Sequence, residues 1–279
     1  MKALKKIIFG ILAVLALLNL AILLTGKTYL YKGIANTYLK GKSGANIDEY
    51  LIFENREVKT GNYQPWPLGA DYNTKPIPAK YLSELENLET IAFLLIKDDS
   101  IRIEHYWEGY SENSFTNSFS MAKTIVSILT GIAIDEGKIK SVDQKVGDFI
   151  NQYKDGEKSK VTIKHLLTMS SGLDFDESYV SPFAFPAESY FGSDLKKTVF
   201  KYDVIEEPGK KFKYLSGNTQ LLSFVLEKAT GMKLSDYCSE KLWKPLGAKN
   251  PGFWSLDHNG GDEKAYCCFN SNARDFARI

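Results

Sequence analysis

The residues Ser120-Met121-Ala122-Lys123 place a hydroxyl and an amine three positions apart, directly before the apolar run 124–134. Residues three apart on a helix lie on the same face, with about 5–6 Å between their Cβ atoms. A serine hydroxyl becomes an effective nucleophile when a neighbouring base takes its proton, and a neutral lysine can act as that base. The spacing therefore predicts Ser120 as a nucleophile and Lys123 as its base. Free N–H groups at a helix start, including that of Ser120, would stabilise the negative oxygen formed during attack.

A second Ser-x-x-Lys step occurs at Ser193 and Lys196, so the spacing alone is not specific. This copy begins a polar helix, and we interpret Ser193 as a helix N-cap that accepts backbone N–H bonds. The same capping role is an open alternative for Ser120.

A tyrosine, Tyr214, lies just before a predicted helix at 219–229. With Ser120, Lys123 and Tyr214, the sequence resembles the serine β-lactamase and penicillin-binding-protein-like hydrolase superfamily. The branch that it resembles contains class C β-lactamases, esterases and 6-aminohexanoate-dimer hydrolases. The resemblance implies that Ser120 is acylated, that Lys123 activates it, and that Tyr214 is the second acid/base group, which gives a proton to the leaving atom. The alternative for Tyr214 is a half-buried aromatic side chain near a helix start.

The resemblance runs from about residue 91 to the end and includes the segments 161–173 and 272–278. Class C enzymes carry Tyr-x-Asn where this chain has Tyr-Leu-Ser, so Ser216 is the candidate substrate-binding residue. Its shorter side chain favours a small ester or amide over a β-lactam.

The sequence ends at Ile279, before any Lys-Thr-Gly or His-x-Gly strand that would form the superfamily's third motif. We therefore expect a truncated chain without the C-terminal strands. Loss of one oxyanion donor lowers turnover by about 10²–10³-fold, so we also expect reduced or absent activity. The alternative function is a non-catalytic or decayed penicillin-recognising homologue that acts as a membrane-tethered binding protein or sensor.

Three lysines precede an apolar run at residues 7–24, which is long enough to cross a bilayer. Because lysines before a span stay on the cytoplasmic side, we expect an uncleaved single-pass anchor in the inner or cytoplasmic membrane, with the catalytic domain outside. A cleaved signal peptide is the alternative. The predicted division is an anchor or signal at 1–26, a stalk and N-terminal arm at 27–80, and an incomplete hydrolase domain at 81–279.

The formal net charge is +1, and no basic stripe is present, which argues against nucleic acid as a partner. The expected partners are a small ester or amide substrate and the membrane, and the oligomeric state is open. The three histidines lack metal-ligand spacing, and the resemblance implies neither a metal nor an organic cofactor. Cys267 and Cys268 are adjacent and Cys238 is separate; we expect small buried side chains, with a bridge allowed in an oxidising compartment.

The predicted fold class is α+β, a β-lactamase-like antiparallel sheet with a helical subdomain. Alternating apolar residues at 91–96 and 101–107 predict a β-hairpin, and a late strand is expected at 265–269. Helical periodicity predicts helices at 120–136, 163–169, 194–199, 219–229 and 234–242. An aromatic loop at 174–192 either lines a substrate cleft or packs on the helical subdomain.

Overall fold

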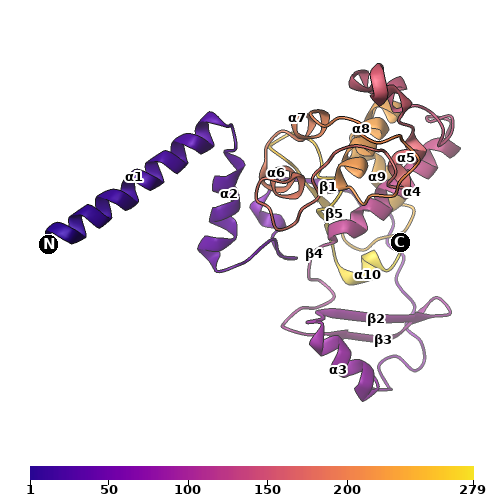
Figure 1. Ribbon diagram of the computed structural model, residues 1–279. Coiled ribbons are helices and arrows are strands. Elements are labelled where there is room, and N and C mark those ends of the chain that lie inside the picture. Colours follow the sequence, from indigo (N-terminus) through magenta and orange to yellow (C-terminus); the bar gives the residue numbers. More distant parts are fainter.

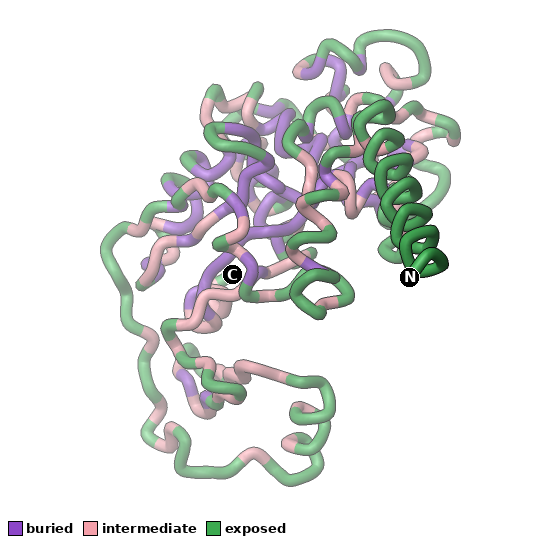
Figure 2. The backbone as a smooth tube through the Cα atoms, turned by 90° about the vertical axis from the view of Figure 1, so that its left-hand side faces the viewer, coloured by how far each residue is buried: buried purple, intermediate pink, exposed green.

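The amino-terminal helix α1 (Lys2–Leu24) stands away from the rest of the molecule in the computed structural model, which describes residues 1–279 (Figure 1). None of its residues is buried (Figure 2). Its 23 residues are long and apolar enough to cross a membrane, which takes about 20. The predicted N-terminal span is thus one continuous helix, which could serve as a membrane anchor or as a signal sequence.

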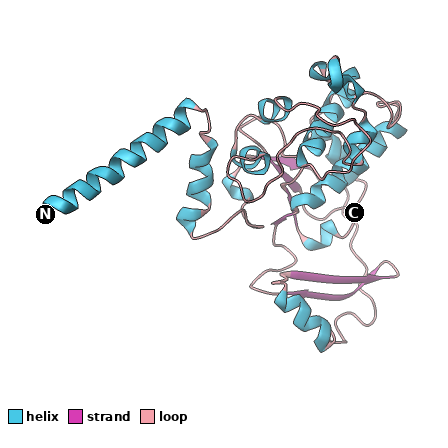
Figure 3. Cartoon of the chain, viewed as in Figure 1, coloured by secondary structure: helices cyan, strands magenta, loops and turns pink.

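A four-stranded antiparallel sheet lies inside the main body, surrounded by helices (Figure 3). Its order is β1-β5-β6-β4, with the strands β1 (Asn55–Val58), β5 (Gly252–Ser255), β6 (Phe269–Ser271) and β4 (Thr116–Asn117). The fully buried Trp243 and Trp254 each pack edge-on against Phe269, with ring centroids 5.1 Å apart. These aromatic contacts fix β6, the strand that supports the start of α4.

The helices after α1 are short, and two of them cross the core. They are α2 (Tyr29–Asn36), α3 (Ala79–Asn87), α4 (Ala122–Asp135), α5 (Ile163–Leu167), α6 (Phe185–Phe191), α7 (Leu195–Phe200), α8 (Ser216–Thr230), α9 (Leu234–Cys238) and α10 (Ala273–Phe276). Tighter 3₁₀ turns lie at Tyr38–Lys40, Tyr50–Ile52, Phe119–Met121, Val146–Asp148, Asn151–Tyr153 and Gly156–Lys160, and a π-helical turn at Ser239–Trp243. The two core helices, α4 and α8, pack against each other, and the first eleven residues of α8 are all buried.

A two-stranded sheet forms a separate lobe with α3, below the main body in Figure 1. Its strands are β2 (Ala92–Lys97) and β3 (Ser100–Tyr106). The Arg274 guanidinium of α10 donates from Nε and Nη2 to the two carboxylate oxygens of the buried Glu104, at 2.7 and 2.5 Å. This two-pronged ion pair ties the hairpin to the body and holds the pKa of Glu104 below its ordinary value despite burial.

The predicted α+β fold with a helical subdomain, the hairpin and the five helices are confirmed, with shifted ends. The late strand is misplaced, because residues 265–268 form a turn and the strand begins at Phe269. The N-cap assigned to Ser193 is also wrong, since Asp194 accepts the Lys197 N–H at 2.9 Å. The domain division stays a prediction; within 27–80, α2 packs against α6 and β1 joins the main sheet.

Candidate active site

Ser120 lies in the 3₁₀ turn that precedes α4, with its side chain exposed. Phe119 before it has a left-handed φ of 43°, a conformation that bulky residues rarely adopt and that local contacts must hold. The Phe119 N–H donates to Asn117 Oδ1 at 2.9 Å, and the Ser118 N–H donates to the Phe269 carbonyl at 2.9 Å. The Ser120 N–H has no acceptor within the chain, so it is free to donate to an oxyanion.

Lys123 is brought to Ser120 by the first turn of α4. Its Nζ lies 3.1 Å from Ser120 Oγ and donates to the Tyr266 carbonyl at 2.8 Å. An amine that donates one N–H to the carbonyl can turn its lone pair toward the serine hydroxyl when it is neutral. These contacts are compatible with the predicted roles of Ser120 as nucleophile and Lys123 as base.

Tyr214 lies near Lys123, two residues before α8. The centroid of its ring is 5.0 Å from Lys123 Nζ, and 39% of the side chain is exposed. The structure therefore brings together Ser120, Lys123 and Tyr214, although the tyrosine is 94 residues beyond the serine (214 minus 120).

Hydrogen bonds from the segment 161–173 fix the backbone next to Tyr214 and the start of α8. The Lys213 N–H donates to the Met169 carbonyl at 2.8 Å, and Ser171 Oγ donates to Asn218 Oδ1 at 2.7 Å in the buried start of α8. A Cβ on Gly217 would lie 2.3 Å from the Phe175 ring, so only glycine allows α8 to approach this close. The fourth predicted site residue, Ser216, is 2% exposed, and its N–H donates to Glu177 Oε2 at 2.8 Å.

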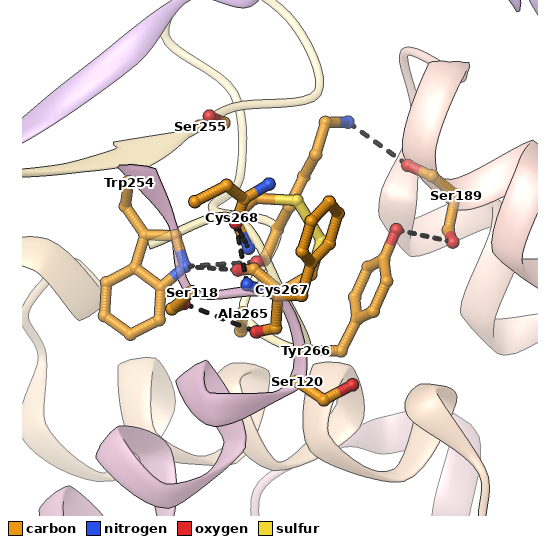
Figure 4. The surroundings of a disulfide bond; sticks show 12 residues. Ser118, Ser120, Ser189, Trp254, Ser255, Ala265, Tyr266, Cys267 and Cys268 are labelled. Atoms are coloured by element: carbon orange, nitrogen blue, oxygen red, sulfur yellow. Dashed lines mark hydrogen bonds between the residues drawn. A yellow bond between two sulfur atoms is a disulfide. The ribbon is translucent and has the colours of Figure 1, made fainter. Parts of the chain in front are cut away.

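The segment 266–268 completes the site, and the sequence patterns did not indicate it. Cys267 and Cys268 form a disulfide next to Ser120 and Tyr266 (Figure 4). The Cys268 N–H donates to Asn117 Oδ1 at 3.1 Å, the oxygen that also accepts the Phe119 N–H. The turn that carries Ser120 and the disulfide are therefore joined through one buried amide side chain. The adjacent cysteines were the only signal in the sequence that could have pointed to this segment.

A second tyrosine near Lys123, Tyr266, has a different environment from Tyr214. Its centroid is 5.8 Å from Lys123 Nζ, but its phenol is buried and accepts a hydrogen bond from Ser189 Oγ at 2.7 Å (Figure 4). Burial raises the pKa of Tyr266 well above its ordinary value. Burial therefore favours the neutral phenol of Tyr266, whereas the Tyr214 side chain is exposed.

A cavity of about 580 Å³ opens beside Ser120. The aromatic loop contributes both to this cavity, which Tyr179, Tyr190 and Phe191 line, and to the core, where Phe175 and Phe185 are buried. That the cavity binds substrate stays a prediction. A concave, mostly apolar site next to a candidate nucleophile is typical of a substrate pocket.

Comparison with known proteins places the chain in a family. Over 209 residues the chain is 26% identical to a 6-aminohexanoate-dimer hydrolase of Paenarthrobacter ureafaciens, covering 70% of this chain and 52% of that protein. The chain spans about half the length of the curated relatives that it matches.

Solved structures share the fold. The structure titled "Putative 6-aminohexanoate-dimer hydrolase from Bacillus anthracis" superposes with a TM-score of 0.72 at 20% identity, covering 83% of this chain and 66% of that one. A penicillin binding protein from Bacillus halodurans superposes with a TM-score of 0.56 at 18% identity, covering 71% and 72%. Residues 79–262, more than half of the chain, match the sequence model of the Beta-lactamase family. The chain belongs to the β-lactamase family.

Proposed function

We propose that this protein is a serine hydrolase that cleaves a small ester or amide through an acyl-enzyme on Ser120. The observation that carries the proposal is the position of Lys123 Nζ, 3.1 Å from Ser120 Oγ and 5.0 Å from the Tyr214 ring. A serine that acts only as an N-cap accepts backbone N–H bonds and needs no amine near its oxygen. The position of Lys123 therefore favours a role for Ser120 as nucleophile over a role as N-cap.

In the proposed acylation step, neutral Lys123 takes the Ser120 proton as Oγ forms a bond to the substrate carbonyl carbon. The carbonyl oxygen becomes negative, and the free Ser120 N–H donates to it. Tyr214 gives its proton to the leaving oxygen or nitrogen as that bond breaks, and recovers a proton from the Lys123 ammonium.

In the deacylation step, water attacks the acyl carbon and loses its proton to the same pair of side chains. The bond to Ser120 Oγ then breaks, and Oγ takes that proton from Lys123, which restores the serine hydroxyl and the neutral amine. In both half-reactions the proton transfers are made by Lys123 and Tyr214.

The known relatives support an ester or amide as substrate. One of them, 26% identical to this chain, is named a 6-aminohexanoate-dimer hydrolase. The family match at residues 79–262 includes both Ser120 and Tyr214. Ser216 lines the cavity, where its short side chain leaves room beside the acyl carbon.

The chain supplies its own matched control for a labelling experiment. A fluorophosphonate probe should label the full chain and should not label Ser120→Ala, whereas Ser193→Ala, in the second Ser-x-x-Lys step, should be labelled like the wild type. Absence of labelling at millimolar probe would contradict the hydrolase proposal and support the non-catalytic binding protein. Equal labelling of Ser120→Ala would remove Ser120 as the nucleophile.

We also propose that α1 anchors the protein in the inner or cytoplasmic membrane as a single pass, with the site on the extracytoplasmic side. The three lysines before the apolar run support this orientation. Protease added to intact spheroplasts should degrade the catalytic body; full protection of it would contradict the orientation.

A further inference from the structure

We propose that the cavity beside Ser120 binds the acyl part of the substrate, and that this acyl part is a long, uncharged, apolar chain. The inference rests on the proposed hydrolase function and names its substrate class. At about 580 Å³ the cavity lies within the 300–1,000 Å³ range of small-molecule sites, and 13 of its 22 lining residues are hydrophobic.

None of the 22 lining residues is charged, and this decides the substrate's chemistry. An ammonium or carboxylate group on the acyl chain would lose its water without gaining an ionic partner, which is strongly unfavourable. A chain of methylene groups loses nothing polar and gains about 0.8 kcal/mol for each group buried. The cavity therefore selects against charged acyl groups and favours apolar ones.

The position of the cavity assigns it to the acyl side of the scissile bond. Ser120, Tyr266 and Cys267 line the cavity, whereas Tyr214 is not among its lining residues. Since Tyr214 is the proposed proton donor to the leaving group, the leaving group lies toward the half-exposed tyrosine. The acyl chain then extends the other way, into the cavity.

One wall of the cavity comes from α2, the helix that follows α1. Leu30 and Ile34 face the cavity from α2, and Tyr190 and Phe191 face it from α6. A Cβ on Gly33 would lie 3.2 Å from the Phe191 ring, so the two helices are in close contact. Figure 1 shows α2 standing between α1 and α6.

Two further contacts hold this wall against the body. Tyr29 Oη donates to the Pro182 carbonyl at 2.9 Å, and Lys32 Nζ lies 4.5 Å from the centroid of the Phe53 ring. Cation–π contacts of this kind contribute about 0.5–1 kcal/mol at exposed sites and more when desolvated. The wall is therefore held against the body, with Leu30 partly buried and Ile34 42% exposed, and its side chains can determine which acyl groups are accepted.

The test is a series of p-nitrophenyl esters from acetate to decanoate, each below its micelle concentration, with the full chain in nanodiscs of a diether phosphatidylcholine. We expect kcat/KM to rise by about two- to fourfold for each added methylene, which is the burial free energy converted to a rate. A flat or falling series with measurable acetate hydrolysis would overturn this inference and leave the proposed function standing. No Ser120-dependent hydrolysis of any ester would overturn both.

A pair of variants on α2 tests whether the cavity causes the dependence of kcat/KM on acyl-chain length. Ile34→Asp puts a charge in the cavity wall and should lower the ratio of decanoate to acetate kcat/KM at least tenfold. Ala35→Asp, an exposed neighbour that does not line the cavity, should leave that ratio unchanged. Equal ratios in Ile34→Asp and the wild type would overturn the assignment of the cavity to the acyl chain. Circular dichroism spectra of both variants in the same nanodiscs, compared with that of the wild type, check that the variants fold.

Discussion

Lys123 Nζ donates a hydrogen bond of 2.8 Å to the backbone carbonyl of Tyr266, a residue 143 positions further along the chain. This bond orients the amine toward Ser120, and the carbonyl that accepts it belongs to the residue before the Cys267–Cys268 disulfide. The disulfide segment is also tied to the nucleophile's turn through Asn117. The position of the proposed base therefore depends on a segment far away in the sequence.

Removing the disulfide should slow acylation. We expect Cys267→Ala/Cys268→Ala to reduce the rate of fluorophosphonate labelling about 10- to 100-fold, because a shift of about 1 Å in a catalytic group has an effect of this size. The measurement is the labelling rate with and without dithiothreitol; the reductant should slow labelling of the wild type and leave the double variant unchanged. Cys238→Ala, which changes a buried free cysteine, is the control and should keep the response. A double variant as fast as the wild type would show that the disulfide does not position Lys123.

Replacing Lys123 by alanine should abolish labelling and leave the thermal midpoint nearly unchanged. The side chain is only partly buried and makes two hydrogen bonds in the folded protein, so its loss should cost little stability. The lysine of the second Ser-x-x-Lys step gives the matched control, because Lys196→Ala removes a side chain that pairs with Asp262 outside the site. Labelling of Lys123→Ala at the rate of Lys196→Ala would exclude Lys123 as the base.

Loss of the Tyr214 hydroxyl should slow the chemistry by about 10²-fold, the lower end of what a positioned acid/base group contributes. Tyr214→Phe keeps the ring that lies against Lys123, so ester hydrolysis should fall without a change in the folded structure. Tyr237→Phe removes a hydroxyl that donates to Glu136 away from the site and should leave hydrolysis unchanged. If both variants hydrolyse the ester alike, Tyr214 has no acid/base role.

The buried Lys264 should make stability depend on pH above neutrality. Desolvation lowers the pKa of this fully buried amine to about 7, from about 10.5 in the unfolded chain. Between these values the unfolded chain binds the extra proton, so raising the pH stabilises the folded protein.

The variant Lys264→Met isolates this effect. The free energy of unfolding of the wild type, relative to Lys264→Met, should rise between pH 7 and pH 10, with a slope of at most about 1.4 kcal/mol per pH unit. Denaturant unfolding of both proteins across this range measures it. A difference that stays constant or falls with pH would show that Lys264 keeps its proton in the folded state.

Local patterns predicted the elements that are long or strongly periodic. The hairpin β2–β3 and the helices α4 and α8 follow from alternation and from 3.6-residue spacing within one segment. The strands β1, β5 and β4 have only two to four residues, and Asn55 pairs with Ser255, 200 positions away. Such pairing depends on packing in three dimensions, and no local sequence pattern predicts it.

The same distinction holds for the site. Ser120 and Lys123 are three residues apart, so helical geometry alone brings them together, and Tyr214 was indicated by resemblance to the family. The contribution of Tyr266 is a backbone carbonyl, which every residue type carries. That contact, and the amide of Asn117 that holds two backbone N–H groups, could be found only from the structure.

Identification of the acylated residue tests the central proposal most directly. The full chain is reacted with a fluorophosphonate, digested, and mapped by tandem mass spectrometry. The account predicts a single adduct on the peptide that contains Ser120, absent from Ser120→Ala, and none on the peptide that contains Ser193. An adduct on any other residue, or no adduct at all, would contradict it.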